Sequence, residues 1–185
     1  MQLTNEQTLS APLQQVWDAL NDTAILQACI PGCETLTLVE ANRYELQILA
    51  AIGPVKARFK GKLQLSDLQP PKSYTIQFEG QGGAAGHGKG AATVLLKPQD
   101  PDTTILHYTA TATVGGKIAQ IGQRLVDMAA QRMAAEFFSN FEKALQPVGE
   151  PLQSVQASPP AANEAKPSLP ARFRQWWLRL FRKKK

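Results

Sequence analysis

The chain has 185 residues, of which 43% are hydrophobic, and a formal net charge of +5 at pH 7. This length suits one domain with a sizeable core plus a short extension. Two cysteines are too few for a disulfide scaffold, and we expect no secretory signal peptide, because no charged segment followed by an apolar one opens the chain. The absence of an eighteen-residue apolar run argues against a membrane-spanning helix. These features predict a cytoplasmic protein.

Two short helices are predicted near the N-terminus, after a first strand. Ser10 followed by Ala11 and Pro12 indicates a cap and an early-helix proline, which open a helix that continues through Leu20. Asp22 is placed to cap a second helix, residues 23–29, which the next Pro-Gly pair ends.

Period-two alternation of apolar and polar side chains then predicts strands at residues 43–50, 55–63, 74–79 and 106–113. In the second segment the polar positions are all basic, which is typical of a solvated sheet face that discourages edge pairing. Short turn signals separate the segments, so we expect an antiparallel meander.

A glycine-rich stretch, residues 80–90, lies between two of these strands. It superficially resembles a phosphate-binding loop, but such a loop needs Ser or Thr after its Gly-Lys pair and a helix after the turn. Here Gly90 follows Lys89 and a strand comes next, so we expect a hairpin of small residues instead of a nucleotide site.

The longest periodic segment, residues 117–145, predicts one long helix with a buried apolar stripe. The stripe consists of Ile118, Ile121, Leu125, Met128, Met133, Phe137, Phe141 and Leu145. The order of elements predicts an α+β fold in which a curved antiparallel sheet wraps around this helix. Such a fold tends to enclose an apolar cavity between the sheet and the helix.

The rest of the chain divides into a linker and a basic end. Residues 147–170 are rich in proline and poor in side chains to bury, which predicts a disordered tether after a folded domain of residues 1–146. Residues 171–185 place aromatic and apolar side chains on one face of a helix and basic ones on the other. The proposed membrane-binding residues are Arg172, Phe173, Arg174, Trp176, Trp177, Leu180, Phe181, Arg182, Lys183, Lys184 and Lys185.

Such an amphipathic helix suits the surface of an anionic membrane, and it is too short to cross about 30 Å of hydrocarbon. Docking into a groove of a partner protein and binding to nucleic acid are the alternatives. Nucleic-acid binders usually carry positive charge on a folded face as well. Here the seven basic residues of 172–185 exceed the net charge of the whole chain. We therefore expect a peripheral protein on the inner face of the cytoplasmic membrane, without nucleic acid as a partner.

Several motifs resemble the CoxG family, the G subunit of carbon monoxide dehydrogenase. They are Val16-Trp17-Asp18-Ala19-Leu20, Cys29-Ile30-Pro31-Gly32-Cys33-Glu34, Ile52-Gly53-Pro54-Val55, the glycine-rich stretch, and Val114-Gly115-Gly116-Lys117-Ile118-Ala119-Gln120-Ile121-Gly122. The resemblance runs in order over residues 1–145. It implies a helix-grip fold of the START/Bet v 1-like (SRPBCC) superfamily, whose members hold hydrophobic ligands under the long helix. It also implies a molybdenum-containing hydroxylase of the carbon monoxide dehydrogenase type as partner, and a respiratory quinone as a ligand that is not covalently bound.

Candidate site residues follow from the expected fold. We expect Trp17, Phe59, Phe78, Leu125, Met128 and Phe137 to line the cavity, and Ile30, Pro31, Gly32 and His87 to lie at its mouth. His87 has three interpretations: a hydrogen-bond donor to a quinone carbonyl, a contact to a partner's redox centre, or an exposed loop residue.

Other chemistry finds little support in the sequence. Zinc needs four ligands, whereas the two cysteines, Cys29 and Cys33, lie far in sequence from the two histidines, His87 and His107. We expect inert thiols, a solvent-facing His107 and no metal site. No Ser/His/Asp or Cys/His set and no pair of carboxylates suggests catalysis, so no catalytic residue is assigned.

The sequence thus predicts a non-enzymatic accessory protein. Its role would be to recruit the hydroxylase to the membrane and to shuttle a quinone for electron transfer. The alternatives are an enzyme of the cyclase or hydrolase type that acts on a hydrophobic substrate, and a lipid carrier.

Overall fold

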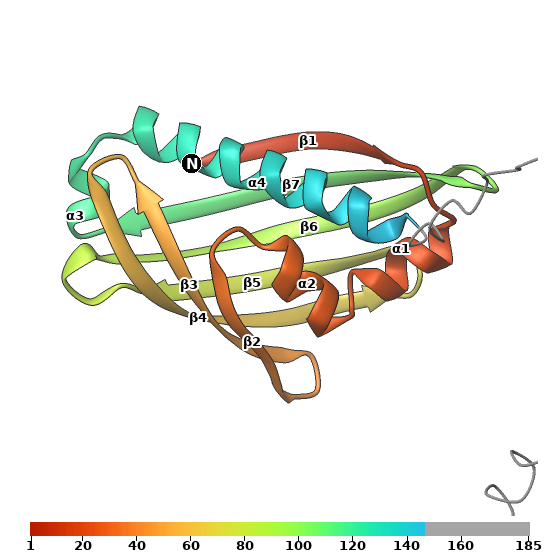
Figure 1. The fold of residues 1–185 in the computed structure, drawn as a ribbon, viewed down its shortest axis with the longest axis horizontal. Helices are drawn as coiled ribbons and strands as arrows, with labels where there is room; N and C mark the ends of the chain where they lie inside the picture. Colours follow the sequence, from red (N-terminus) through yellow and green to blue (C-terminus); the bar gives the residue numbers. More distant parts are fainter. Residues whose placement is uncertain (147–185) are drawn as a thin grey trace, which may run out of the picture. The chain divides into compact units, whose positions relative to one another are not determined.

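Seven antiparallel strands form one sheet in the order β1-β7-β6-β5-β4-β3-β2 (Figure 1). In this computed structural model, which describes residues 1–146, strands β2 to β7 follow one another as a meander and β1 pairs with β7. The strands are β1 (Gln2–Leu9), β2 (Cys33–Glu40), β3 (Arg43–Ile52), β4 (Val55–Gln69), β5 (Ser73–Gln81), β6 (His87–Asp100) and β7 (Thr103–Gly115). The predicted meander is confirmed.

Helices cover one face of this sheet. They are α1 (Leu13–Ala19), α2 (Thr23–Cys29), α3 (Lys117–Gln120) and α4 (Gln123–Leu145), and a 3-10 turn, η1 (Gly83–Ala85), joins β5 to β6. Figure 1 shows α4 running along the sheet, with α2 between it and β2. The α+β helix-grip architecture expected from the sequence is therefore present.

The two ends of the sheet hold different elements. The hairpin end holds the β3–β4 turn at residues 53–54, the β5–β6 connection at 82–86, and the start of α4. The α1 end holds α1, the β4–β5 turn at residues 70–72, the β6–β7 turn at 101–102, and the last turn of α4. Because α4 runs antiparallel to β7, it spans from the first end to the second (Figure 1).

The prediction of one continuous helix over residues 117–145 is wrong at one point. The chain breaks between α3 and α4, where Gly122 has φ +97°, a conformation outside the right-handed helical region. The break also rotates the apolar stripe. The buried residue in the first part of α4 is Val126, and not Leu125 as the uninterrupted periodicity predicts.

The starts of the two short helices differ in how they are capped. Asp22 Oδ1 accepts hydrogen bonds from the backbone N–H groups of Ala24 (2.8 Å) and Ile25 (3.1 Å), as predicted. At α1 the N-cap residue is Pro12, which makes no side-chain hydrogen bond. The prediction that Ser10 caps this helix is therefore wrong. The fixed φ of proline and its missing N–H suit the start of a helix without such a bond.

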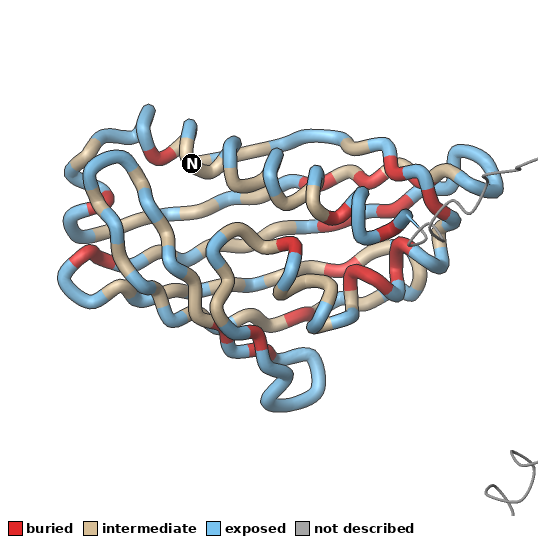
Figure 2. The backbone as a smooth tube through the Cα atoms, viewed as in Figure 1, coloured by how far each residue is buried: buried red, intermediate tan, exposed pale blue. Residues whose placement is uncertain are grey.

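Many of the buried residues lie toward the α1 end of the sheet (Figure 2). Five residues there are at most 2% exposed: Phe141, Leu9, Leu96, Leu106 and Val16. Polar side chains tie the same region together. The hydroxyl of buried Thr104 donates to the Ala11 carbonyl at 2.8 Å, Gln15 Nε2 donates to the Leu145 carbonyl at 2.8 Å, and Asn140 Nδ2 donates to the Cys29 carbonyl at 3.3 Å. These bonds connect the start of α1 to β7, α1 to the end of α4, and α4 to α2.

The predicted linker (147–170) and the predicted membrane-binding helix (171–185) lie outside the described residues, so both stay predictions. Within residues 1–146, no helix has the length and apolar character needed to span a membrane.

Candidate ligand cavity

An apolar cavity of about 220 Å³ lies between the helices and the inner face of the sheet. It is enclosed by α1, α2, α4 and the strands of the meander. The lining residues are Leu20, Leu26, Ile30, Leu36, Tyr44, Leu63, Leu65, Tyr74, Ile76, Ala92, Val94, Leu106, Tyr108, Phe137 and Phe138. All of these side chains are aliphatic or aromatic, so the cavity favours an apolar occupant.

Three tyrosines supply the polar side-chain groups of this lining. Tyr44, Tyr74 and Tyr108 are all buried, and burial raises the pKa of each phenol above its ordinary value. The effect is largest at Tyr74. For Tyr108, a hydrogen bond with the Asn5 side chain opposes part of this rise in pKa. All three phenols therefore stay neutral and can donate a hydrogen bond.

Aromatic rings form the α4 side of the cavity. Phe138 stacks on Tyr108 with ring centroids 5.2 Å apart and an interplanar angle of 30°. Phe137 meets Phe138 edge to face at 5.1 Å and stacks on Phe141 at 5.7 Å. Offset-stacked and edge-to-face pairs of this kind are favourable arrangements of the ring quadrupoles. Phe137, Phe138 and Tyr108 thus border the cavity as one packed group of aromatic rings.

Among the six predicted lining residues, Phe137 lines this cavity. Trp17 is buried but does not line the cavity. It packs edge to face on the lining residue Tyr74, with ring centroids 5.5 Å apart. Phe59 and Phe78 lie on the inner face but closer to the hairpin end. Their rings cover Gly82 and Gly90, so that a Cβ added at either glycine would collide with them. These three aromatic residues thus support the fold around the cavity.

Leu125 and Met128 do not line the cavity, contrary to the prediction. They are 42% and 55% exposed, because the break at Gly122 turns them away from the sheet and turns Val126 toward it. Leu125 lies instead against the β3–β4 turn, where its Cδ1 atom is 3.7 Å from the position a Cβ would take on Gly53.

The predicted mouth residues divide between two places. Ile30 lines the cavity, and Pro31 and Gly32 line an adjoining surface depression between α2, β2 and α4. The turn is fixed to β3 because Leu49 N–H donates to the Gly32 carbonyl at 2.8 Å. Gly32 has φ +71°, and a Cβ there would collide with the Leu49 carbonyl oxygen, so this turn requires glycine.

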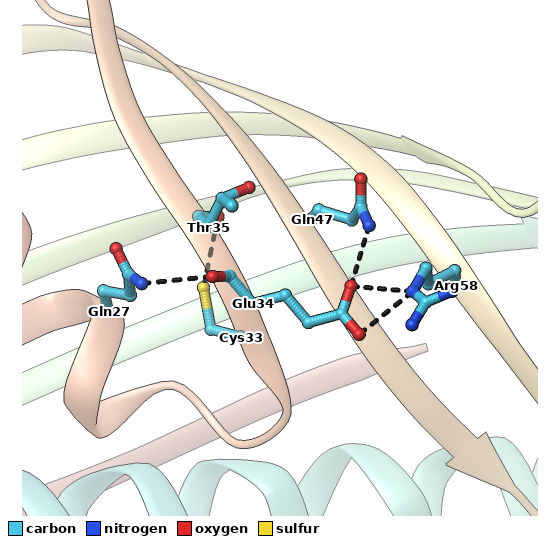
Figure 3. Close-up of polar contacts among 6 residues, drawn as sticks. All are labelled: Gln27, Cys33, Glu34, Thr35, Gln47 and Arg58. Carbon is cyan, nitrogen blue, oxygen red and sulfur yellow. Dashed lines mark hydrogen bonds and ion pairs between the residues drawn. The ribbon is translucent and has the colours of Figure 1, made fainter.

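Glu34 holds the strand that follows this turn (Figure 3). Its carboxylate accepts hydrogen bonds from Arg58 Nε at 2.7 and 2.9 Å and from Gln47 Nε2 at 2.7 Å, which joins β2 to β3 and β4. Arg58 is the main cause of a Glu34 pKa below its ordinary value. On the open edge of β2, the side chain of Gln27 bonds to the backbone as a neighbouring strand would. Its Nε2 atom donates to the Glu34 carbonyl at 3.1 Å, and its Oε1 atom accepts from the Leu36 N–H at 3.3 Å.

The histidines lie away from the cavity. His87 begins β6 at the hairpin end, pairs with Gly115, and is exposed, so the structure does not bring it together with Ile30, Pro31 and Gly32. This placement corresponds to the exposed-residue interpretation. His107 lies on the outer face of β7, where its Nδ1 atom is 2.9 Å from the Glu6 carboxylate.

The cysteines are placed as ordinary thiols. Burial raises the pKa of the Cys29 thiol and is the largest cause of the raised pKa of Cys33. Cys33 Sγ contacts the Thr35 carbonyl at 3.4 Å. Across residues 1–146, no group of three or more His, Cys, Asp and Glu side chains is arranged to hold a metal ion.

Comparison with known proteins identifies the family. The family model for CoxG, described as the G subunit of carbon monoxide dehydrogenase, matches residues 6–146. The chain belongs to the CoxG family. No curated protein matches the chain. CoxG membership supports, at a coarse level, a role as an accessory to a carbon monoxide dehydrogenase.

Solved structures confirm the CoxG chain's fold. A conserved protein from Geobacillus kaustophilus is 31% identical, with a TM-score of 0.75 over 78% of this chain and 95% of that chain. A START superfamily protein from Mycobacterium smegmatis (13% identity, TM-score 0.60, 78% and 96% coverage) shares the fold. So does the Zhui aromatase/cyclase from Streptomyces sp. R1128 (12% identity, TM-score 0.58, 78% and 93% coverage).

Residue-level prediction missed most of the cavity of this CoxG protein. The three tyrosines, Ile76 and Phe138 line it but were not among the expected lining residues. A signal was available for several of them: Tyr44, Tyr74, Ile76 and Tyr108 occupy apolar positions of alternating strands, which places them on the inner face.

Proposed function

We propose that this CoxG protein carries an apolar molecule with a ring-shaped, oxygen-bearing headgroup, of the isoprenoid quinone class, between a bilayer and a molybdenum hydroxylase of the carbon monoxide dehydrogenase type. The apolar cavity under α4, in a chain of this family, is the observation that carries the proposal. The residues that would hold the headgroup are Tyr44, Tyr74, Phe137 and Phe138.

The size of the cavity supports a ring and opposes a whole lipid. An engineered protein cavity of about 150 Å³ takes up benzene, and pockets for drug-sized ligands start near 300 Å³. At about 220 Å³, the cavity suits a headgroup of one or two rings. A long prenyl chain would have to extend beyond the described lining.

The chemistry of the walls supports an oxygen acceptor on that ring. Because Tyr44 and Tyr74 stay neutral, they can donate to a carbonyl oxygen of the ligand. Phe138 and Tyr108, whose rings stack on each other, add aromatic wall beside these phenols. A quinone, with carbonyl groups on a planar ring, fits this combination.

The same walls favour a carrier over a cyclase or hydrolase. The titratable groups of the lining are tyrosines, and burial raises the pKa of each one. General acid–base catalysis works best with a pKa near the working pH. Phenols whose pKa is raised by burial are poorly matched to that task.

Membrane attachment is the second part of the proposal. The basic, aromatic segment 171–185 would hold the protein on an anionic leaflet, and the proline-rich segment 147–170 would let the domain reach both the bilayer and the enzyme. The supporting observations are the composition of these segments and the family membership.

Quenching of Trp17 fluorescence by a short-chain quinone tests the cavity. Trp176→Phe/Trp177→Phe leaves Trp17, which packs on Tyr74, as the only tryptophan. We expect saturable quenching, which Ala92→Leu abolishes because Ala92 lines the cavity. Ala91→Leu, next along β6 on its other face, is the matched control and should leave quenching unchanged. Equal quenching in both leucine variants would contradict the proposal.

A further inference from the structure

The charges of the folded domain are distributed unevenly between its two ends. Near the hairpin end, exposed basic residues outnumber acidic ones: Lys56, Lys60, Lys89, Lys117 and Arg124 against Glu79 and Asp127, while Arg58 is neutralised by its ion pair with Glu34. Near the α1 end the balance is reversed: Asp18, Asp22, Asp67, Asp100, Asp102, Glu136 and Glu142 against Lys72, Lys97 and Lys143. A negatively charged surface would attract the first end and repel the second.

Exposed apolar side chains gather at the same basic end. Met128 is 55% exposed and Leu125 is 42% exposed, both on the first turns of α4. Leu125 adjoins the β3–β4 turn, in which Gly53 and Pro54 are also exposed. The patch therefore extends from the hairpin tip to α4, where exposed Arg124 precedes Leu125, and exposed Lys117 lies on α3 at the same end of the sheet.

A second exposed apolar pair provides a contrast. Leu38 and Val39, near the β2–β3 turn, are 52% and 44% exposed. Their charged surroundings are different, because Glu40 follows them and pairs with Arg43 at 2.9 Å. Exposure alone thus does not distinguish the hairpin end; the combination of apolar side chains with an excess of basic ones does.

We propose that the hairpin end of the folded domain is a docking surface for an anionic bilayer. Leu125 and Met128 enter the headgroup region, and Lys56, Lys117 and Arg124 contact lipid phosphates. Apolar side chains ringed by Lys and Arg suit this boundary, because their long stems cover apolar surface while their charges reach the phosphates. The acidic α1 end then faces away from the membrane. This docking goes beyond attachment through residues 171–185 and does not depend on the ligand.

Fluorescent labelling of the full chain tests the orientation. In a Cys33→Ser background, Cys29 is only 1% exposed and stays unlabelled. An environment-sensitive NBD label is placed at Met128→Cys or, as a matched control of similar exposure, at Leu38→Cys. The probe is phosphatidylcholine vesicles with or without phosphatidylglycerol. We expect a severalfold, blue-shifted rise in emission at position 128 on the anionic vesicles, and little change at position 38.

Charge reversal supplies the second measurement. Lys117→Glu/Arg124→Glu should abolish most of the emission rise at position 128, whereas Lys72→Glu/Lys97→Glu at the other end should preserve it. A chain that sediments with vesicles without a rise at position 128, or with an equal rise at position 38, would overturn the proposal while leaving attachment through 171–185 intact. A response to purified hydroxylase but not to vesicles would also overturn it, by showing a protein interface. A chain that does not sediment would overturn both.

Discussion

The indole ring of Trp17 meets the phenol ring of Tyr74 edge to face, with centroids 5.5 Å apart and planes inclined by 80°. Tyr74 forms part of the cavity wall, and Trp17 supports it from behind. Both residues are buried, at 7% and 4% exposure. The packing of α1 against the sheet therefore sets the position of the one wall residue whose phenol pKa is raised most.

Trp17→Ala is expected to destabilise the protein strongly. Removing a buried aromatic side chain costs about 3–5 kcal/mol through lost burial and the resulting cavity. Urea unfolding followed by far-UV circular dichroism measures this change, and Trp17→Phe should recover part of the loss. A loss below about 1 kcal/mol for Trp17→Ala would show that the site collapses around the gap.

Tyr74→Phe should separate ligand recognition from stability. The ring and its packing on Trp17 remain, but the hydroxyl that would donate to a ligand oxygen is lost. A neutral hydrogen bond contributes about 1 kcal/mol, so the affinity for a short-chain quinone should fall roughly fivefold. Tyr108→Phe is the control: Asn5 lies opposite Tyr108 on β1 and offers its hydroxyl an alternative polar partner, so this change should lower the affinity less. An equal loss in both variants would argue against a specific role of Tyr74.

Glu34→Gln should change how stability depends on pH. The carboxyl pKa is lowered in the folded protein, chiefly by Arg58, so its contribution is present above the ordinary value of 4.5. It is lost as pH falls through the lower, folded pKa. The Tm of the variant should be below that of wild type at neutral pH, and the difference should disappear in acid. A difference that persists at a pH below the folded pKa, where the Glu34 carboxyl of the wild type is itself protonated, would indicate a packing effect of the glutamine instead.

Gly32→Ala should destabilise the turn at the cavity more than a matched substitution elsewhere. A positive φ costs a non-glycine residue roughly 1–2 kcal/mol, and at Gly32 a Cβ also collides with the Leu49 carbonyl oxygen. Gly83→Ala shares the first penalty, with φ +58°, but its Cβ would meet no atom within 4 Å. Thermal unfolding should therefore rank Gly32→Ala clearly below Gly83→Ala. Equal Tm values would contradict the role assigned to the Leu49 contact.

The sequence predicted four strands of the sheet, β3, β4, β5 and β7, because each of them carries a clear alternation. Tyr44 and Leu46 on β3, like Tyr74 and Ile76 on β5, fall on the inner face as their period-two pattern requires. The long helix was predicted less well. The stripe through Leu125 and Met128 assumes an unbroken 3.6-residue period, whereas Gly122 interrupts the helix and changes its phase.

The position of the cavity along the sheet could not be predicted from periodicity. Alternation shows which face a residue occupies but not which part of that face the helix fills. Phe59 and Phe78 have the correct face, yet they pack over Gly82 and Gly90 toward the hairpin end. Which aromatic residue covers a glycine and which borders empty space depends on the register between strands, and that register appears only in three dimensions.

Native mass spectrometry of the full chain, purified from its own host without detergent, tests the proposed carrier role most directly. We predict an adduct with the mass of an isoprenoid quinone on the wild-type chain. The adduct should be absent from Ala92→Leu, which fills the cavity, and retained by Ala91→Leu on the opposite face of β6. A wild-type chain without any adduct, or an adduct that survives Ala92→Leu, would contradict quinone binding in this cavity.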